Sequence, residues 1–399
     1  MSEYQYYEFA AVNQQLTEQA QSELRSRSTR ATITASCFIN EYHWGNLKGE
    51  PLDWVERFFD AHVYSSSWGN CRLLLRIPRD VIDAKVILDC VDTPGHSASA
   101  SMPTAFEVNR TAQHSILDWA FNDDSGEHAR FYEQADGPGW MARLLPLRDE
   151  LLRGDTRSLY LGWLARLVNG ELRDSDREPS LPNGLQTLTP AQASLAEFMM
   201  LDPDWLAAAA ETSPPLLADV DDDARFEPWL LELTAAEMRD ALRQLLRGNA
   251  QETERGLRTR FLNWDRTRNP GRAEPVTRRT VAEIDARRDA ARALRLRRER
   301  AANDAAEVRR IAERRRYLDS LIEHESMTWE RLDTKLQRGS GHAYGAAFQL
   351  LQDLAEAYAC VKNDAAFRRG LVRLMAKHGN RGAWVKRLMN GGFMWTPKT

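Results

Sequence analysis

The sequence predicts an α+β protein, with a small mixed sheet and helices at the N-terminus followed by mainly helical middle and C-terminal parts. Three observations support this class. Segments 4–12 and 31–39 are rich in strand-forming residues, and the second alternates as a strand does. Residues 281–325 contain no Pro or Gly and are dense in Ala, Arg and Glu, as in a long helix. Beyond residue 328, apolar residues recur at the spacing of helix faces.

Residues 1–135 are expected to form an α/β domain. A polar helix ending near Ser28 separates the first two strands, and Pro51 starts a helix with an apolar stripe. The order of elements predicts a small sheet with helices on one face. The predicted strands are 4–12, 31–39 and 72–78, with 86–91, 105–110 and 113–121 as further candidates.

Two similar dipeptides, Trp44-Gly45 and Trp68-Gly69, lie 24 residues apart. A tryptophan followed by a left-handed glycine commonly ends an element, so both are interpreted as structural turns. The other interpretation is a paired aromatic rim around a ligand.

Residues 136–263 are expected to form a helical domain. Segments 139–153 and 157–169 predict two helices, and Pro190 starts a third, which Pro203 interrupts. An acidic loop at 214–223 precedes a helix expected at about 228–248.

Residues 264–280 are the clearest linker in the chain. Asn269-Pro270-Gly271 and Pro275 prevent a continuous helix, and the segment lacks apolar residues with a regular period. We therefore predict a mobile, protease-sensitive segment, with the acidic loop as a second place for a cut. Its basic residues are the candidate cleavage positions: Arg266, Arg268, Arg272, Arg278 and Arg279.

Residues 281–327 are expected to form one long arginine-rich helix. Between Arg278 and Arg316 there are 14 Arg against 7 acidic residues. One interpretation is a basic rod that contacts phosphates or another partner. The other, which the composition favours, is a solvated helix stabilised by ion pairs four residues apart, such as Glu283 with Arg287. The candidate contact residues are Arg287, Arg288, Arg297, Arg298, Arg314, Arg315 and Arg316.

Residues 328–399 are expected to form a module of two or three antiparallel helices with short loops. Trp329 and Phe348 belong to its apolar stripes and should lie in packed helix interfaces. No strict sequence repeat accompanies them, so a repeat array is not predicted.

The net charge of −4 conceals an uneven distribution. Residues 1–225 carry 19 basic and 35 acidic residues, a net −16, whereas residues 226–399 carry a net +12. Such asymmetry predicts contact between the two parts, or a basic part that faces an anionic partner.

The chain has the features expected of a cytoplasmic protein. No stretch approaches the roughly 20 apolar residues of a membrane span, and MSEYQYYEF is not typical of a signal peptide. The four cysteines lack the spacing of a metal site and are interpreted as buried thiols. No membrane contact and no cofactor are expected.

Signals for catalysis are weak. Asp92-Thr93-Pro94-Gly95-His96 resembles a nucleotide-sensing loop, but no phosphate-binding GxxxxGK[ST] loop precedes it. The eight histidines form no metal-binding motif. An enzyme would need a site assembled from separated residues such as His43, Asp92 and His96, and we regard catalysis as the weakest of three hypotheses.

The segments MSEYQYYEF, TRATITASCFINEYHWGNLKGEP and FFDAHVYSSSWGNCRLLLRIP resemble a family of uncharacterised bacterial proteins. The tail, with YGAAFQLLQDLAEAY, resembles the helical tail shared by that family and some bacterial SWIM-zinc-finger proteins. The zinc-finger cysteines are missing here, so the resemblance implies no zinc.

The layout is also similar to that of substrate proteins encoded beside CRISPR-linked caspase-like proteases, which have a body, a cuttable linker and a C-terminal part. This resemblance implies a non-enzymatic regulator or adaptor in a bacterial defence or stress pathway. The partner would be a caspase-like protease or a sigma factor. The alternative is a nucleic-acid-binding protein that uses the arginine-rich helix.

Overall fold

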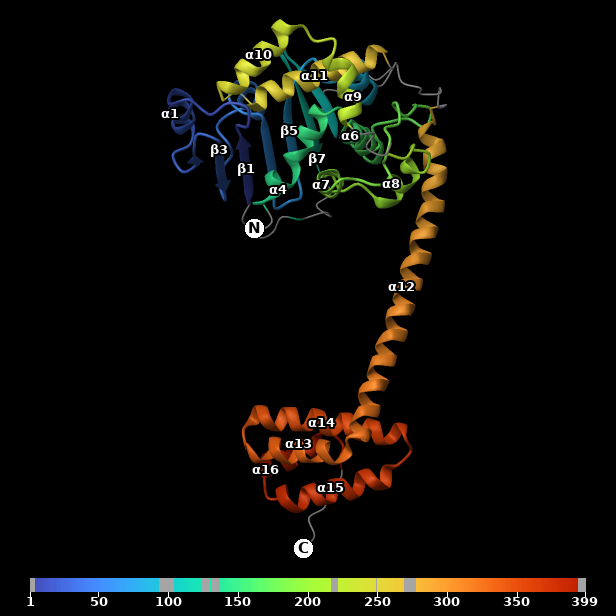
Figure 1. Ribbon diagram of the computed structural model, residues 1–399. Helices are drawn as coiled ribbons and strands as arrows, with labels where there is room; N and C mark the ends of the chain where they lie inside the picture. The colour runs from blue at the N-terminus through green and yellow to red at the C-terminus, as the bar shows by residue number, and fades with distance from the viewer. Residues whose placement is uncertain are drawn as a thin grey trace. The chain divides into compact units, whose positions relative to one another are not determined.

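The computed structural model describes residues 4–92, 104–122, 130, 137–216, 222–248, 250–268 and 278–393. The chain divides into two compact units, residues 1–295 and residues 296–399 (Figure 1). The first contains a sheet and helices and the second is helical, which confirms the predicted α+β class.

Among the residues that the structure describes, seven strands form one antiparallel sheet in the first unit, in the order β2-β3-β1-β4-β5-β7-β6. The N-terminal strand β1 lies inside the sheet, with β3 on one side and β4 on the other. The strands are β1 (Gln5–Ala10), β2 (Thr32–Ile33), β3 (Cys37–Tyr42), β4 (Ala61–Ser66), β5 (Cys71–Pro78), β6 (Phe106–Arg110) and β7 (His114–Phe121).

The strand predicted at 86–91 is wrong, because these residues belong to helix α3 (Ala84–Val91). The Asp83 side chain accepts a hydrogen bond from the backbone N–H of Lys85 and caps the helix. Ile87 and Cys90, three residues apart, are its buried residues. The apolar run therefore follows the period of a helix.

Helices cover both faces of the sheet, not one face as predicted. On one face, Val63, Leu73, Leu75 and Trp119 pack against α3 and the helices of residues 140–210. On the other face, Phe9, Phe38 and Leu74 pack against α1 (Glu18–Arg27) and α2 (Pro51–Arg57). The helices of the first set are α4 (Trp140–Leu144), α5 (Pro146–Leu152), α6 (Arg157–Val168), α7 (Pro190–Phe198) and α8 (Pro203–Ala210).

Proline and glycine punctuate these elements in the expected way. Pro146 starts α5 and divides the single helix predicted for 139–153. Pro190 and Pro203 each begin a helix, as predicted. Gly45 and Gly69 have φ of +82° and +99°, which confirms the two left-handed turns after tryptophan.

Three helices follow in the first unit: α9 (Asp222–Leu230), α10 (Ala235–Leu246) and α11 (Ala250–Arg268). Thr234 and Glu237 form a capping box that starts α10, so the single helix predicted for 228–248 is two helices. The ring of Phe261 packs edge-on against Phe226 and Trp229 and joins α9 to α11.

The second unit contains most of the long helix α12 (Val281–Glu323), followed by α13 (Glu325–Gln337), α14 (Gly341–Cys360), α15 (Asp364–His378) and α16 (Gly382–Asn390). Its core confirms the predicted apolar stripes and is centred on Leu332, Leu351, Leu354 and Trp384. Trp329 and Phe348 lie at the edge of this core, half-buried. Among the described residues, no helix is both long and apolar enough to cross a membrane.

Candidate functional site

The start of α12 is held to the first unit by backbone hydrogen bonds. The N–H of Glu178 donates to the carbonyl of Arg279 at 2.9 Å, and the N–H of Val281 donates to the carbonyl of Asp176 at 2.9 Å. Thr280 and Glu283 then cap the helix reciprocally, side chain to backbone N–H in both directions. Residues 278–280 are therefore an ordered connection.

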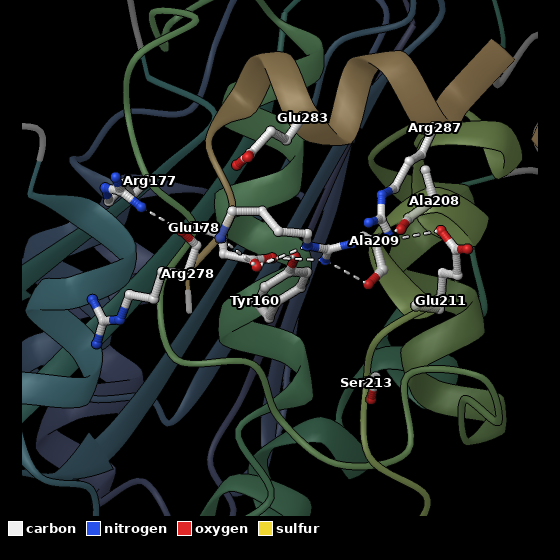
Figure 2. A network of polar contacts seen from close by, with 12 residues as sticks. Tyr160, Arg177, Glu178, Ala208, Ala209, Glu211, Ser213, Arg278, Glu283 and Arg287 are labelled. Atoms are coloured by element: carbon white, nitrogen blue, oxygen red, sulfur yellow. Dashed lines mark hydrogen bonds and ion pairs between the residues drawn. The ribbon is translucent and has the colours of Figure 1, made fainter. Parts of the chain in front are cut away.

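A buried ion pair reinforces this connection (Figure 2). The Arg279 guanidinium donates from Nε to Glu178 Oε1 and from Nη2 to Oε2, both at 2.8 Å. The Tyr160 hydroxyl donates to Glu178 Oε2 at 2.9 Å. Arg279 also donates to the carbonyl oxygens of Ala208 (3.0 Å) and Ala209 (2.9 Å). We call Glu178, Arg279 and Tyr160 the anchor.

The environment of the anchor keeps Arg279 charged and Tyr160 neutral. Burial alone disfavours the charge of Arg279, but the hydrogen bonds to Glu178 and its negative charge together outweigh that cost and raise the pKa of the guanidinium. Burial, followed by the negative charge of Glu178, raises the pKa of Tyr160 well above its usual value. Neither group is poised to transfer a proton near neutral pH. This geometry is suited to fixing the start of α12 and not to acid–base catalysis.

Further arginines of the basic part meet acids of the acidic part around the anchor. Arg278 pairs with Asp89 at 2.6 Å, and Arg287 pairs with Glu211 at 2.9 Å. Arg295 forms a two-pronged pair with Asp204, at 2.7 and 2.8 Å. Part of the excess positive charge of the basic part is thus neutralised by ion pairs within the first unit. Arg288 lies over the ring of Trp205, 4.8 Å from its centroid.

The structure places both ends of the predicted linker 264–280 in ordered elements. Arg266 and Arg268 belong to α11, and Arg268 pairs with Glu232. Arg278 and Arg279 lie in the ordered connection described above, and their cleavage by a protease stays a prediction. Arg272 lies outside the described residues. The sequence does not reveal that Glu178, about 100 residues away, forms an ion pair with Arg279 at the end of this segment.

The expected contact residues of the long helix divide into two groups. Arg287 and Arg288 are engaged in the first unit, Arg314 pairs with Asp353 and Glu356, and Arg315 pairs with Asp319. The remaining three, Arg297, Arg298 and Arg316, are exposed and form no ion pair within the described chain. The expected pair of Glu283 with Arg287 is replaced by the cap at Thr280 and the pair with Glu211.

The exposed stretch of α12, residues 296–313, is unlike either end of that helix. Every one of its residues is exposed. It contains five arginines and four acidic residues, together with three large apolar side chains in solvent: Leu296, Val308 and Ile311. By contrast, Ile284 near the start and Leu318 near the end of α12 are buried.

The positions considered for catalysis do not form a site in the described residues. His43 packs beside Tyr4, and Asp92 ends α3, while His96 lies outside the described residues. Cys71 and Cys90 are buried, and burial raises the pKa of each thiol to about 12. The prediction of buried thiols is wrong for Cys360, which is exposed. No three His, Cys, Asp or Glu side chains of the described chain are placed to hold a metal ion.

Comparison with known proteins adds no relative. No protein-family model, no curated protein and no solved structure matches the sequence. The anchor and the exposed stretch are therefore the features that bear on function.

Proposed function

We propose that the protein is a non-enzymatic adaptor or regulator that binds another protein through the exposed stretch of α12. The observation that carries this proposal is the exposure of all residues from Leu296 to Glu313, in a helix whose two ends are each packed into a core. Large apolar residues alternate there with arginines, a mixture typical of protein interfaces.

The charge of this stretch favours a protein partner over nucleic acid. Its five arginines are nearly balanced by four acidic residues, whereas a phosphate-binding surface needs a clear excess of positive charge. Many arginines outside the stretch are already paired with acids of the same chain.

Site-specific photo-crosslinking tests the proposal. A photoreactive residue at Val308 should capture a discrete protein in an extract of the native host. The matched control carries the same residue at Val372, which is similarly exposed on α15. We expect the double variant Arg297→Glu/Arg298→Glu to lose the crosslink at Val308. Identical products from both positions would count against a specific surface.

A gel-shift titration tests the nucleic-acid alternative. Binding to duplex DNA should be weak, with a shallow dependence on salt, and Arg297→Glu/Arg298→Glu should not change it. A logarithmic salt slope of about −3 or steeper that is reduced in the variant would favour the alternative.

If the chain is regulated by proteolysis, the anchor should hold the two fragments together after the cut. A cut between residues 268 and 278 leaves Arg278, Arg279, Arg287 and Arg295 on the C-terminal fragment, and all four bind the N-terminal one. We therefore expect the two fragments to stay together after a brief trypsin digest and to elute as one species from a sizing column. In Glu178→Gln they should separate, and spontaneous separation of the wild-type fragments would remove the anchor from this scheme.

A further inference from the structure

A polar pocket of about 380 Å³ lies on the sheet face that α1 and α2 only partly cover. Its walls include Tyr7, His62, Tyr64, Arg72, Glu107 and Asp118, together with Pro51 at the start of α2. All of these residues belong to the first unit, and the pocket is separate from the anchor.

The strand register explains why these side chains gather. Tyr7 pairs with Tyr64, and Tyr64 pairs with Arg72, so one row of side chains crosses β1, β4 and β5. The next row runs from His62 through Leu74 to Asp118 and Glu107. Because side chains two residues apart along a strand share a face, both rows point to the same side of the sheet.

The pocket carries more negative than positive charge. Arg72 binds Asp118 with two hydrogen bonds, at 3.0 and 2.7 Å, and reaches Glu50 at 3.9 Å. Glu107 lies directly opposite Asp118, a like-charge pairing that destabilises a sheet. Desolvation, followed by the charge of Asp118, raises the pKa of Glu107. Within the pocket, one arginine therefore faces two carboxyl groups, and Glu107 also accepts a hydrogen bond from the Thr104 hydroxyl at 3.3 Å.

A second feature of the pocket is an unsatisfied acceptor. His62 is fully buried, and its Nδ1 lies 3.0 Å from the carbonyl oxygen of Glu8. An oxygen acceptor requires Nδ1 to carry the proton, so Nε2 presents a lone pair, and it has no partner in the described chain. Buried polar atoms without a partner are rare and commonly mark the place of a ligand or water.

We propose that this pocket binds an organic cation, a guanidinium or primary ammonium group on a small molecule or on a peptide side chain. N–H donors satisfy Glu107 and the histidine acceptor, and the positive charge relieves the repulsion between Glu107 and Asp118. Tyr7 and Tyr64 line the same pocket, and tyrosine rings are among the groups that attract cations. A divalent metal fits less well, because Asp118 is engaged by Arg72 and such ions need about six oxygen ligands.

Calorimetry on the full-length chain tests the proposal with two probes. Agmatine represents a free cation, and acetyl-Gly-Arg-Gly-amide represents an arginine side chain. We expect one-to-one binding of at least one probe, and the tighter of the two identifies the source. Butyrate, an anion of similar size, should not bind. Failure of both cations, or preferential binding of butyrate, would overturn the proposal.

Matched variants locate the binding. Glu107→Gln should weaken the affinity for the cationic probe by about 10-fold, because one charged hydrogen bond is lost. Glu56→Gln on the exposed face of α2 removes the same charge outside the pocket and should leave affinity unchanged. Because the pKa of Glu107 is raised, binding at mildly acidic pH should release protons from wild type but not from Glu107→Gln. Equal affinity of wild type and Glu107→Gln would place the cation elsewhere and refute the assignment.

Discussion

The two ends of α12 are held by different physical means. At the start, Arg279 is buried with Glu178, and hydrogen bonds surround the pair. At the end, Leu318 and Leu321 pack among the leucines of α13 and α14. Apolar packing stabilises any arrangement that fills the volume, whereas a buried ion pair requires one particular partner. The first contact is therefore the more selective, and it is more easily disrupted by changing one charge.

The largest expected effect is on the apolar end. Trp384 is fully buried in the second unit, so Trp384→Ala should cost about 3–5 kcal/mol of that unit's stability. Trp329 and Phe348, which the sequence indicates equally, are half-buried and should cost less when truncated. Thermal denaturation of the three variants checks this order. An equal loss in all three would mean that burial does not set the cost here.

Breaking the polar end should have an effect almost as large. Glu178→Gln leaves the Arg279 charge buried without its counter-ion, which costs about 3–5 kcal/mol. Replacing both residues, as in Glu178→Leu/Arg279→Met, should recover much of that loss. Chemical denaturation of the single and double variants measures it. A double variant no more stable than the single one would show that the hydrogen bonds matter more than the charge.

Acid should weaken the first unit in a way that identifies His62. Burial lowers the pKa of His62 from 6.5 to about 3. Between these two pH values the unfolded chain binds a proton at this residue and the folded chain does not. Stability contributed by the neutral ring is complete above pH 6.5 and is lost as pH falls toward 3. Melting temperatures measured from neutral pH to pH 4 should fall less steeply in His62→Phe than in wild type. Parallel curves would contradict a buried neutral histidine.

The smallest effect should come from the rim of the anchor. Arg287 and Glu211 are both exposed, so Arg287→Ala should cost less than about 1 kcal/mol, and this cost should shrink as added salt screens the pair. Denaturant titration at low and high salt is the measurement. A loss of stability comparable to that of Glu178→Gln would show that the exposed pair stabilises the anchor as much as the buried pair does.

Local pattern was sufficient for much of the fold. The strands at Gln5–Ala10 and Cys71–Pro78 and the helices that begin at prolines follow from period and capping alone. Strand order was beyond reach, because β1 pairs with β3 and β4, which are distant in sequence. The segment at Ala84–Val91 was misjudged because a short apolar run fits either period.

The functional residues were harder to predict than the fold. Arg279 looks like any other arginine of a proline-rich segment, and Glu178 stands in an unremarkable loop. The available signal was Thr280 followed by Glu283, the spacing of a capping box, which places the helix start beside Arg279. The polar pocket left no local signal, since its side chains come from five strands and meet only through the sheet register.

The hydrogen bonds from Arg279 to Ala208 and Ala209 have a topological consequence. They bring together two points about 70 residues apart in the sequence. The chain between them therefore leaves the first unit's core and returns to the same place, as a long loop does. Such a loop adds only a slowly growing entropy cost with length. Helices α9, α10 and α11 therefore have the character of an insertion, which can be exchanged or shortened without changing the order of the strands.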